Sequence, residues 1–177
     1  RQLIIDGIGT EMARQGSVPE DDLELAREAS AFYLKLSESI LRASPDNHVL
    51  AEAVTAGFTQ YAYAFVAFEA EQAESRDVRK AQILRERAAR LYARAQRHGL
   101  AMLERNISTL GDVIRADDLS HQSPLPAKMV GLAYWTAAAW GSWISLSKHD
   151  PEIVAQLPQV IQLARLAWQT DPDWGQG

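Results

Sequence analysis

The chain has 177 residues, of which 47% are hydrophobic and 23% are charged, and this composition is ordinary for a globular protein with a buried core. Its formal net charge of −5 argues against a general binder of nucleic acids or anionic membranes. The absence of cysteine excludes disulfides, thiolate metal sites and a thiol nucleophile. No run is apolar enough to span a membrane, since Gly141, Ser142 and Ser145 interrupt even the stretch around Trp140.

The first residues predict a short helix over 1–16 followed by a longer one over 19–43. Because the chain starts at Arg1 and not at Met, we expect an upstream segment such as an export signal. Ser17-Val-Pro-Glu20 has the pattern of a capping box for the second helix. The first helix carries the apolar cluster Leu3, Ile4, Ile5, Ile8 and Met12 and ends at Gly16. The second is expected to bury the stripe Leu25, Ala29, Phe32, Leu36 and Ile40.

A third helix is predicted over 47–74, after a stop at Ser44-Pro-Asp-Asn47. Its run from Gly57 to Ala70 is rich in aromatics and alanine and has almost no polar face, so it must lie between other helices or line a cleft. The expected buried stripe is Leu50, Val54, Gly57, Tyr61, Phe65 and Phe68, broadened by Phe58, Ala62 and Val66.

The rest of the chain predicts three further helices and a loop. A helix over 77–105 has an apolar face, formed by Leu84, Ala88, Leu91, Ala95, Gly99 and Met102. Residues 106–123 lack periodicity and are expected to form a loop, with a fourth long helix following over 123–148. The last helix starts at Asp150-Pro151-Glu152 and should bend or divide near Gln156, because of Pro158.

No convincing strand is present, so the predicted class is all-α. We expect one helical domain over 1–177, built of stacked antiparallel helix pairs in a degenerate tetratricopeptide-like array. The proline turns near Pro45 and Pro172 are typical of such repeats. Their spacing is not a multiple of the 34-residue repeat, however, and the helices are longer than those of regular repeats.

Two polar groupings invite a functional interpretation. His121 follows Asp117 and Asp118, which is compatible with a metal or general-base role, but an ordinary solvated loop is the better explanation. The 77–105 helix carries Arg87, Arg90, Arg94 and Arg97 on the side opposite its apolar face. A nucleic-acid site is conceivable there, but the acidic chain favours a solvated face that meets an acidic partner. We expect no catalytic residues, metal or cofactor.

The segment Tyr134-Trp135 to Trp140-Gly-Ser-Trp143 is the strongest candidate for a cleft besides the run at Tyr61 and Phe65. Trp140 and Trp143 share one helix face, and Trp135 points about 140° away from Trp140 at 100° per residue. Such a helix either packs closely on both sides or packs on one side and faces an apolar cleft or interface on the other. Core packing is the more common outcome for both segments.

Several segments, taken in order, resemble the T-component (TatT) family of TRAP transporters. They are Asp21–Ala29, Phe32–Glu38, Gly57–Val66, Arg87–Ala95 with Gly99-Leu100, Tyr134-Trp135, Ala139–Ile144, Asp171-Pro172 and Trp174-Gly175. The resemblance implies a periplasmic, lipid-anchored, all-helical protein with cryptic tetratricopeptide-like repeats. It also implies a homotrimer with a central pore that binds the periplasmic substrate-binding P-component and has a hydrophobic cleft for apolar ligands. Family members continue beyond the Trp174-Gly175 point, so further C-terminal helices and an upstream lipidated cysteine are expected.

The leading hypothesis is therefore a non-enzymatic scaffold that docks the P-component and helps to deliver an apolar or organic-acid substrate. The cleft candidates are Tyr61, Phe65, Tyr134, Trp135, Trp140 and Trp143, since aromatic side chains bury a large area with a defined shape. The partner-binding candidates are Arg87, Arg90, Arg94 and Arg97. The alternatives are a stand-alone carrier of small molecules or lipids and, less favoured, an enzyme that uses His121 with Asp117 or Asp118.

Overall fold

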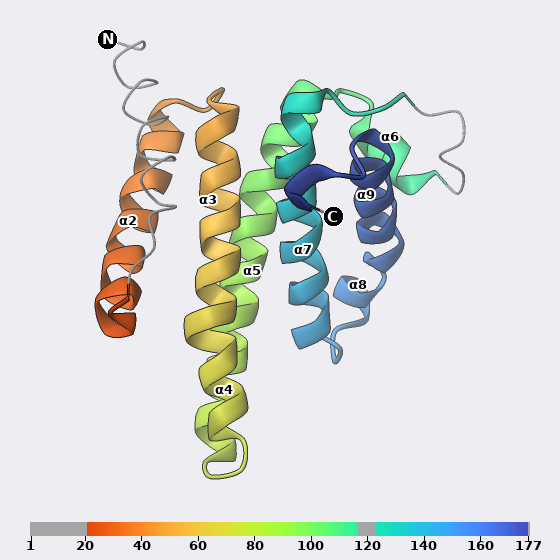
Figure 1. Ribbon diagram of the computed structural model, residues 1–177. Coiled ribbons are helices and arrows are strands. Elements are labelled where there is room, and N and C mark those ends of the chain that lie inside the picture. Colours follow the sequence, from red (N-terminus) through yellow and green to blue (C-terminus); the bar gives the residue numbers. More distant parts are fainter. Residues whose placement is uncertain (1–20, 117–122, 177) are drawn as a thin grey trace.

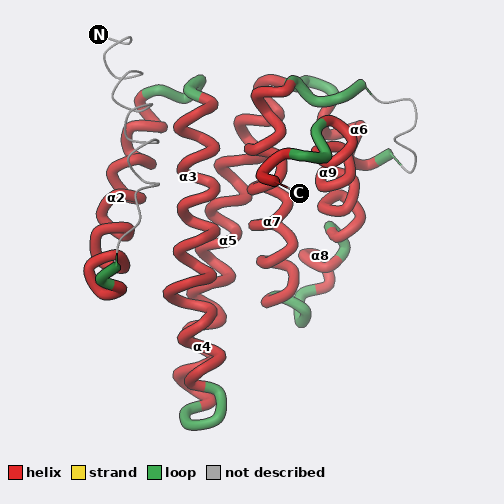
Figure 2. The backbone as a smooth tube through the Cα atoms, in the orientation of Figure 1, coloured by secondary structure: helices red, strands yellow, loops and turns green. Residues whose placement is uncertain are grey.

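The computed structural model describes residues 21–116 and 123–176, and within these ranges it contains helices and no strand (Figures 1 and 2). The all-α prediction is confirmed. The helices pack side by side in pairs, an arrangement compatible with tetratricopeptide-like stacking. The long elements are α2 (Leu23–Ala43), α3 (His48–Tyr61), α5 (Val78–Asn106), α7 (Val130–Leu146) and α9 (Leu157–Thr170).

Helix α2 begins later than the sequence pattern predicted. Asp22 is its N-cap, and its carboxylate accepts hydrogen bonds from the backbone amides of Glu24 and Leu25, both at 3.0 Å. This cap satisfies amides that have no partner inside the helix, so the helix starts at Leu23 and not at residue 19. The expected helix over 1–16 and the capping box at 17–20 lie outside the described residues.

The predicted core face of α2 is wrong. Leu25, Phe32 and Leu36 are 50%, 71% and 41% exposed, Ala29 is also exposed, and only Ile40 packs against the core. The physical reason is that the side chain of Glu38 points inward to Arg94 and His98 of α5, and this orientation turns the most apolar face of α2 away from the core. The buried side chains of α2 are Leu34, Ser37, Glu38 and Leu41.

The predicted 47–74 helix is present but is not α-helical throughout. Asn47 caps α3 by accepting from the Leu50 amide at 3.0 Å. The six residues Ala62–Ala67 form a π-helical segment, η1, and α4 (Phe68–Ala73) completes the rod. The wider turn shifts the later side chains around the axis, so Phe68 is 53% exposed and not part of the buried stripe. As expected, the rod lies between other helices, with α2 on one side and α5 on the other (Figure 1).

Helix α5 buries the face that its pattern predicted and packs most extensively on α7. Gly99 marks the closest approach: a Cβ added there would lie 2.0 Å from Thr136 Oγ1 of α7 and 3.1 Å from Thr55 Cγ2 of α3. The centre of the molecule is thus a three-helix contact of α3, α5 and α7.

Two boundaries in the second half differ from the predictions, and one agrees. The predicted loop over 106–123 contains a short helix, α6 (Leu110–Arg115), because Leu110 and Ile114 are buried. Pro124 and Pro126 keep residues 123–126 out of a helix, so α7 begins at Val130 after a 3₁₀ turn, η2 (Ala127–Met129), and not at residue 123. The division near Gln156 is confirmed: α8 (Pro151–Val154) ends there, and α9 follows.

Candidate ligand groove and partner surface

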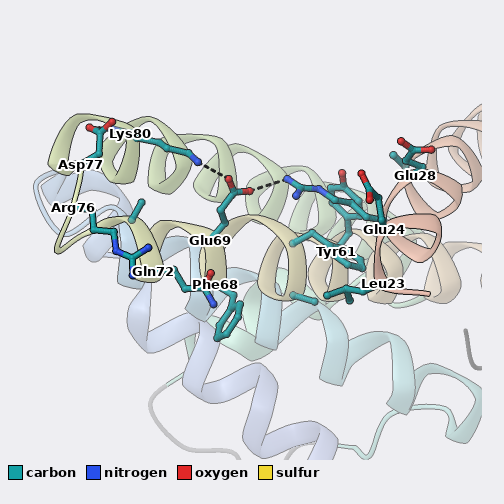
Figure 3. A pocket seen from close by; sticks show the side chains of 15 residues that line it. Leu23, Glu24, Glu28, Tyr61, Phe68, Glu69, Gln72, Arg76, Asp77 and Lys80 are labelled. Carbon is teal, nitrogen blue, oxygen red and sulfur yellow. Dashed lines mark hydrogen bonds and ion pairs between the residues drawn. The ribbon is translucent and has the colours of Figure 1, made fainter. Parts of the chain in front are cut away.

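An open groove of about 970 Å³ lies between the first half of α2, the η1–α4 part of the central rod and the start of α5 (Figure 3). Its apolar lining includes Leu23, Ala31, Tyr61, Phe65 and Phe68. Its polar lining includes four acidic and three basic side chains, namely Glu24, Glu28, Glu69, Asp77, Arg27, Arg76 and Lys80. The groove therefore has an aromatic wall and a nearly balanced charged rim.

The aromatic wall is set by the π-helical segment. Tyr61 is the last residue before η1, Ala64 and Phe65 lie within it, and all three line the groove. The rings of Tyr61 and Phe65 are tilted by 52° with centroids 5.3 Å apart, so they form one continuous surface. π-Helical turns inside α-helices occur often at functional sites, because the extra residue redirects side chains. Periodicity alone predicted an ordinary α-helix here.

Glu69 ties the three walls of the groove together. Its carboxylate lies 2.8 Å from Nη2 of Arg27 on α2 and 2.9 Å from Nζ of Lys80 on α5 (Figure 3). The hydrogen bonds from Lys80 and Arg27 lower the pKa of Glu69, and the hydrogen bond to Glu69 raises the pKa of Arg27. Arg76 lines the groove without an ion pair to any described residue, so its guanidinium is available to a ligand carboxylate.

The aromatics of α7 lie elsewhere and do not line this groove. Trp140 is only 3% exposed and donates from Nε1 to Gln156 Oε1 at 2.8 Å, which makes it a core residue. Trp143 is half-buried and packs against the core. Tyr134 meets Trp135 edge-on at 5.2 Å and Trp174 at 5.0 Å between ring centroids, near the end of the chain. Of the six predicted cleft aromatics, the structure brings only Tyr61 and Phe65 together at a groove.

A buried charge cluster, which the sequence pattern did not reveal, joins α2 to α5. Glu38 is 3% exposed and accepts hydrogen bonds from Nε and Nη2 of Arg94, from Lys35 Nζ at 2.7 Å, and is 2.8 Å from His98 Nε2. Burial alone would raise the pKa of Glu38, but the hydrogen bonds from Arg94, Lys35 and His98 outweigh it and hold that pKa far below its usual range. The Arg94 guanidinium also lies 5.0 Å from the centroid of the Phe58 ring.

The contacts of Glu38 show that Arg94, one of the predicted partner-binding residues, has a partner inside the chain. Arg94 is partly buried and bound to Glu38, so it does not belong to the solvent-facing set. Arg87, Arg90 and Arg97 are exposed on α5 and have no ion pair within the described part of the chain. The signal that could have identified Glu38 is its place between Leu34 and Leu41, where a charge on a helix's buried side requires a partner.

The proposed acid–base group of His121, Asp117 and Asp118 lies outside the described residues. Within the residues described, no group of His, Cys, Asp and Glu side chains is arranged to hold a metal ion. Among those residues, no helix combines the length and the apolar character that a membrane crossing requires.

The structure is thus an all-helical scaffold with an open groove and with exposed arginines on α5. The family described as TRAP transporter T-component matches residues 19–177, so the chain belongs to that family. The comparison with curated proteins gave no match. Membership makes the chain an accessory component of a TRAP transporter that associates with other components of the transporter and acts in the periplasm or at the membrane.

Proposed function

We propose that this T-component binds the transporter's periplasmic substrate-binding P-component and holds an apolar or organic-acid ligand in its groove, without catalysing a reaction. The groove is the observation that supports the proposal: two aromatic rings form its wall, and its rim includes the guanidinium of Arg76, which makes no ion pair with a described residue. Such a site suits an elongated ligand with an apolar body and a carboxylate end.

Docking of the P-component is assigned to the exposed face of α5. Arg87, Arg90 and Arg97 recur there along one side of the helix and have no acidic partner among the described residues. An acidic patch on the P-component would complement them, speed up the encounter and fix the orientation of the complex. We expect the mature protein to be periplasmic, lipid-anchored and trimeric.

Light scattering after size-exclusion chromatography tests docking and oligomeric state together. The chain is run alone, with the P-component, and with an unrelated binding protein as a control. Docking predicts co-elution with the P-component only, at a mass equal to the sum of the two components in a fixed ratio. Separate elution of the two proteins at micromolar concentrations would show that docking is wrong.

The ligand site is tested by denaturing extraction followed by mass spectrometry, then by titration of any compound found. Replacing both Tyr61 and Phe65 by alanine should weaken binding by about tenfold or more, because two aromatic contacts are lost. Trp168→Ala on the far helix α9 is the matched control, since Trp168 is 66% exposed and does not line the groove. Equal ligand affinities of the double variant and the control would show that the ligand does not bind in the groove.

A stand-alone carrier is the second candidate function, and the groove favours it if no docking is observed. The two functions differ in one result. A carrier loaded with its ligand retains the ligand when the P-component is added, whereas an accessory component passes the ligand to the P-component or shares it with that partner.

A further inference from the structure

The outer side of α2 carries an apolar stripe that the described residues leave exposed. Four residues form it, and we call them the outer stripe: Leu25, Ala29, Phe32 and Leu36. They fall within about 60° of the helix circumference at 100° per residue and lie opposite Leu34, which faces the core. Phe32 is 71% exposed and Leu25 is 50% exposed. Helix α2 stands at one edge of the row of described helices, so this side points away from α3 (Figure 1).

An exposed stripe at this place in the fold calls for a partner. In stacked helical arrays the terminal helix normally has a polar outer face, because no further unit covers it. Helix α2 instead has apolar residues on both its inner and its outer side. Contiguous exposed apolar side chains in a protein of this kind usually mark a contact with another molecule.

The spacing of the outer stripe is the same in both chain directions. Its intervals are four, three and four residues, the intervals of apolar seams between paired helices. A second α2 that lies antiparallel to the first can therefore place every stripe residue opposite another stripe residue. Leu25 of each copy then faces Leu36 of the other, and Ala29 faces Phe32. No other antiparallel register pairs all four, so the stripe is complementary to itself.

Side-chain size and charge fit the same register. Phe32 is the largest residue of the stripe and meets Ala29, the smallest, so the ring of one copy enters the space that the other leaves. Exposed Glu28 and Lys35 lie about 20° apart on one flank of the stripe. A two-fold rotation of antiparallel helices brings like flanks together, which places Glu28 of each copy near Lys35 of the other. Lys35 bonds Glu38 at 2.7 Å and has further ammonium protons for this pair.

The charges also favour an antiparallel pair over a parallel one. In a parallel pair the flank with Glu28 and Lys35 would face the other flank of the partner helix, which carries Ala26 and Tyr33 and no charge. Phe32 would then meet Phe32. Only the antiparallel pair combines matched sizes with two pairs of opposite charge.

We propose that a second copy of the chain covers the outer stripe, with the two α2 helices antiparallel and related by a two-fold axis. Such a contact uses one surface twice, and a self-complementary surface is what it requires. It closes between two copies and differs from any contact that makes a trimer. The assembly therefore has two chains, or six where trimers form through another surface. A single pair of helices buries less than the roughly 800 Å² per partner of a standard interface, so the assembly should dissociate on dilution.

Light scattering after size-exclusion chromatography measures the mass of the full chain alone, from about 5 µM to about 500 µM. The expected mass at the upper end is that of two or six chains. Phe32→Asp should weaken this association about tenfold or more, because the contact would bury a carboxylate without a partner. Its circular dichroism should stay unchanged, since Phe32 is exposed in the single chain. The matched control Trp168→Asp replaces a ring on α9 that is 66% exposed and should associate like the native chain.

A mass of one or three chains at the highest concentration would overturn the proposal. That result is expected if another segment of the chain or a different protein covers the stripe. Equal association of Phe32→Asp and the native chain would overturn it as well.

Engineered cysteines test the register, since the 177 residues contain none. In Leu25→Cys/Leu36→Cys the two positions lie roughly 16 Å apart along one helix, too far for a disulfide within the chain. Mild oxidation should therefore give a covalent dimer that links position 25 of one copy to position 36 of the other. Trypsin cleaves after Arg27 and Lys35, so mass spectrometry distinguishes the linked peptides.

The control Gln169→Cys, at an exposed position on α9, should stay mostly reduced under the same conditions. Links of position 25 to 25 and of 36 to 36 as the main products would overturn the antiparallel pairing. A double variant that is no more cross-linked than the control would overturn it too.

Discussion

Glu38 shows how one buried charge can decide the orientation of a helix. A carboxylate that is 3% exposed is costly unless cations and hydrogen bonds compensate it, and here Arg94, Lys35 and His98 do so. These interactions hold α2 against α5, and in this orientation the most apolar side of α2 stays exposed.

Replacing Glu38 by glutamine should lower the free energy of unfolding at pH 7 by about 2–4 kcal/mol, because the cations around it lose their charged partner. Folding lowers the pKa of Glu38 below its usual 4.5, so its stabilisation is present above that value and lost on acidification. The difference between the variant and the native protein should therefore shrink below about pH 4.5 in denaturant titrations. Glu104→Gln, at an exposed position on α5, is the control and should change stability little.

Glu52 should behave in the opposite way. Burial raises its pKa, and its carboxylate adjoins Gly131 and the Trp174 ring without a hydrogen bond or ion pair to any described residue. A raised pKa in the folded state means that folding favours the protonated form of Glu52. Its contribution to stability is therefore most favourable at acid pH and is lost as the pH rises. Glu52→Gln should then raise the free energy of unfolding at pH 7 by about 1 kcal/mol, with the gain disappearing near pH 4. Destabilisation at pH 7 would show that the ionised carboxylate has a partner.

At the scale of elements, the contact of α3, α5 and α7 depends on the missing side chain at Gly99. Thr136 Oγ1 lies 2.0 Å from the position that an added methyl group would take, and Thr55 Cγ2 lies 3.1 Å from it. Glycine in the middle of a helix usually weakens it, so close packing is the compensating gain.

Gly99→Ala should destabilise the protein by about 1–3 kcal/mol, because the added methyl group overpacks the contact. Adding Thr136→Ala should recover part of the loss, since the nearest obstructing atom is Thr136 Oγ1. The matched control is Gly141→Ala on α7, where the added Cβ would lie at an ordinary 3.7 Å from Val160 Cγ1 and the change should be neutral or stabilising. Chemical denaturation of the four proteins checks this, and equal stabilities for Gly99→Ala and Gly141→Ala would contradict it.

At the scale of the whole molecule, the distribution of charge separates a partner surface from a ligand site. The net charge of −5 hides an exposed basic side of α5, whereas the groove has a nearly balanced rim. Attraction to an acidic partner should therefore be confined to this side of α5 and should depend on ionic strength.

The charge reversal Arg87→Glu/Arg90→Glu/Arg97→Glu should weaken P-component binding by tenfold or more at low salt, mainly through a slower association rate. The loss should diminish as salt rises, because screening removes the attraction in the native protein too. Arg165→Glu, at an exposed position on α9, tests whether charge reversal at an unrelated arginine also weakens binding. An unchanged circular dichroism spectrum of each variant would show that its fold is intact. Equal binding of the triple variant and the native chain would exclude this face.

Local signals determined the helices themselves. Asn47 and Asp150 cap as their sequence positions predicted, Pro158 lies at the division between α8 and α9, and the apolar face of α5 is the buried one. Order and spacing of short segments were also sufficient to indicate the T-component family, which the family comparison shows. These features depend on residues a few positions apart, and such contacts form within a single helix or turn.

Only the tertiary structure decided which face of α2 is buried, that the central rod contains a π-helical segment, and that Tyr61 and Phe65 share a groove while Trp140 lies in the core. Each of these outcomes depends on partners far away in sequence: Arg94 for Glu38, Arg27 and Lys80 for Glu69, Gln156 for Trp140. The sequence shows whether a residue is apolar or charged. The hydrogen bonds and opposite charges that make burial of a polar residue favourable come from another helix.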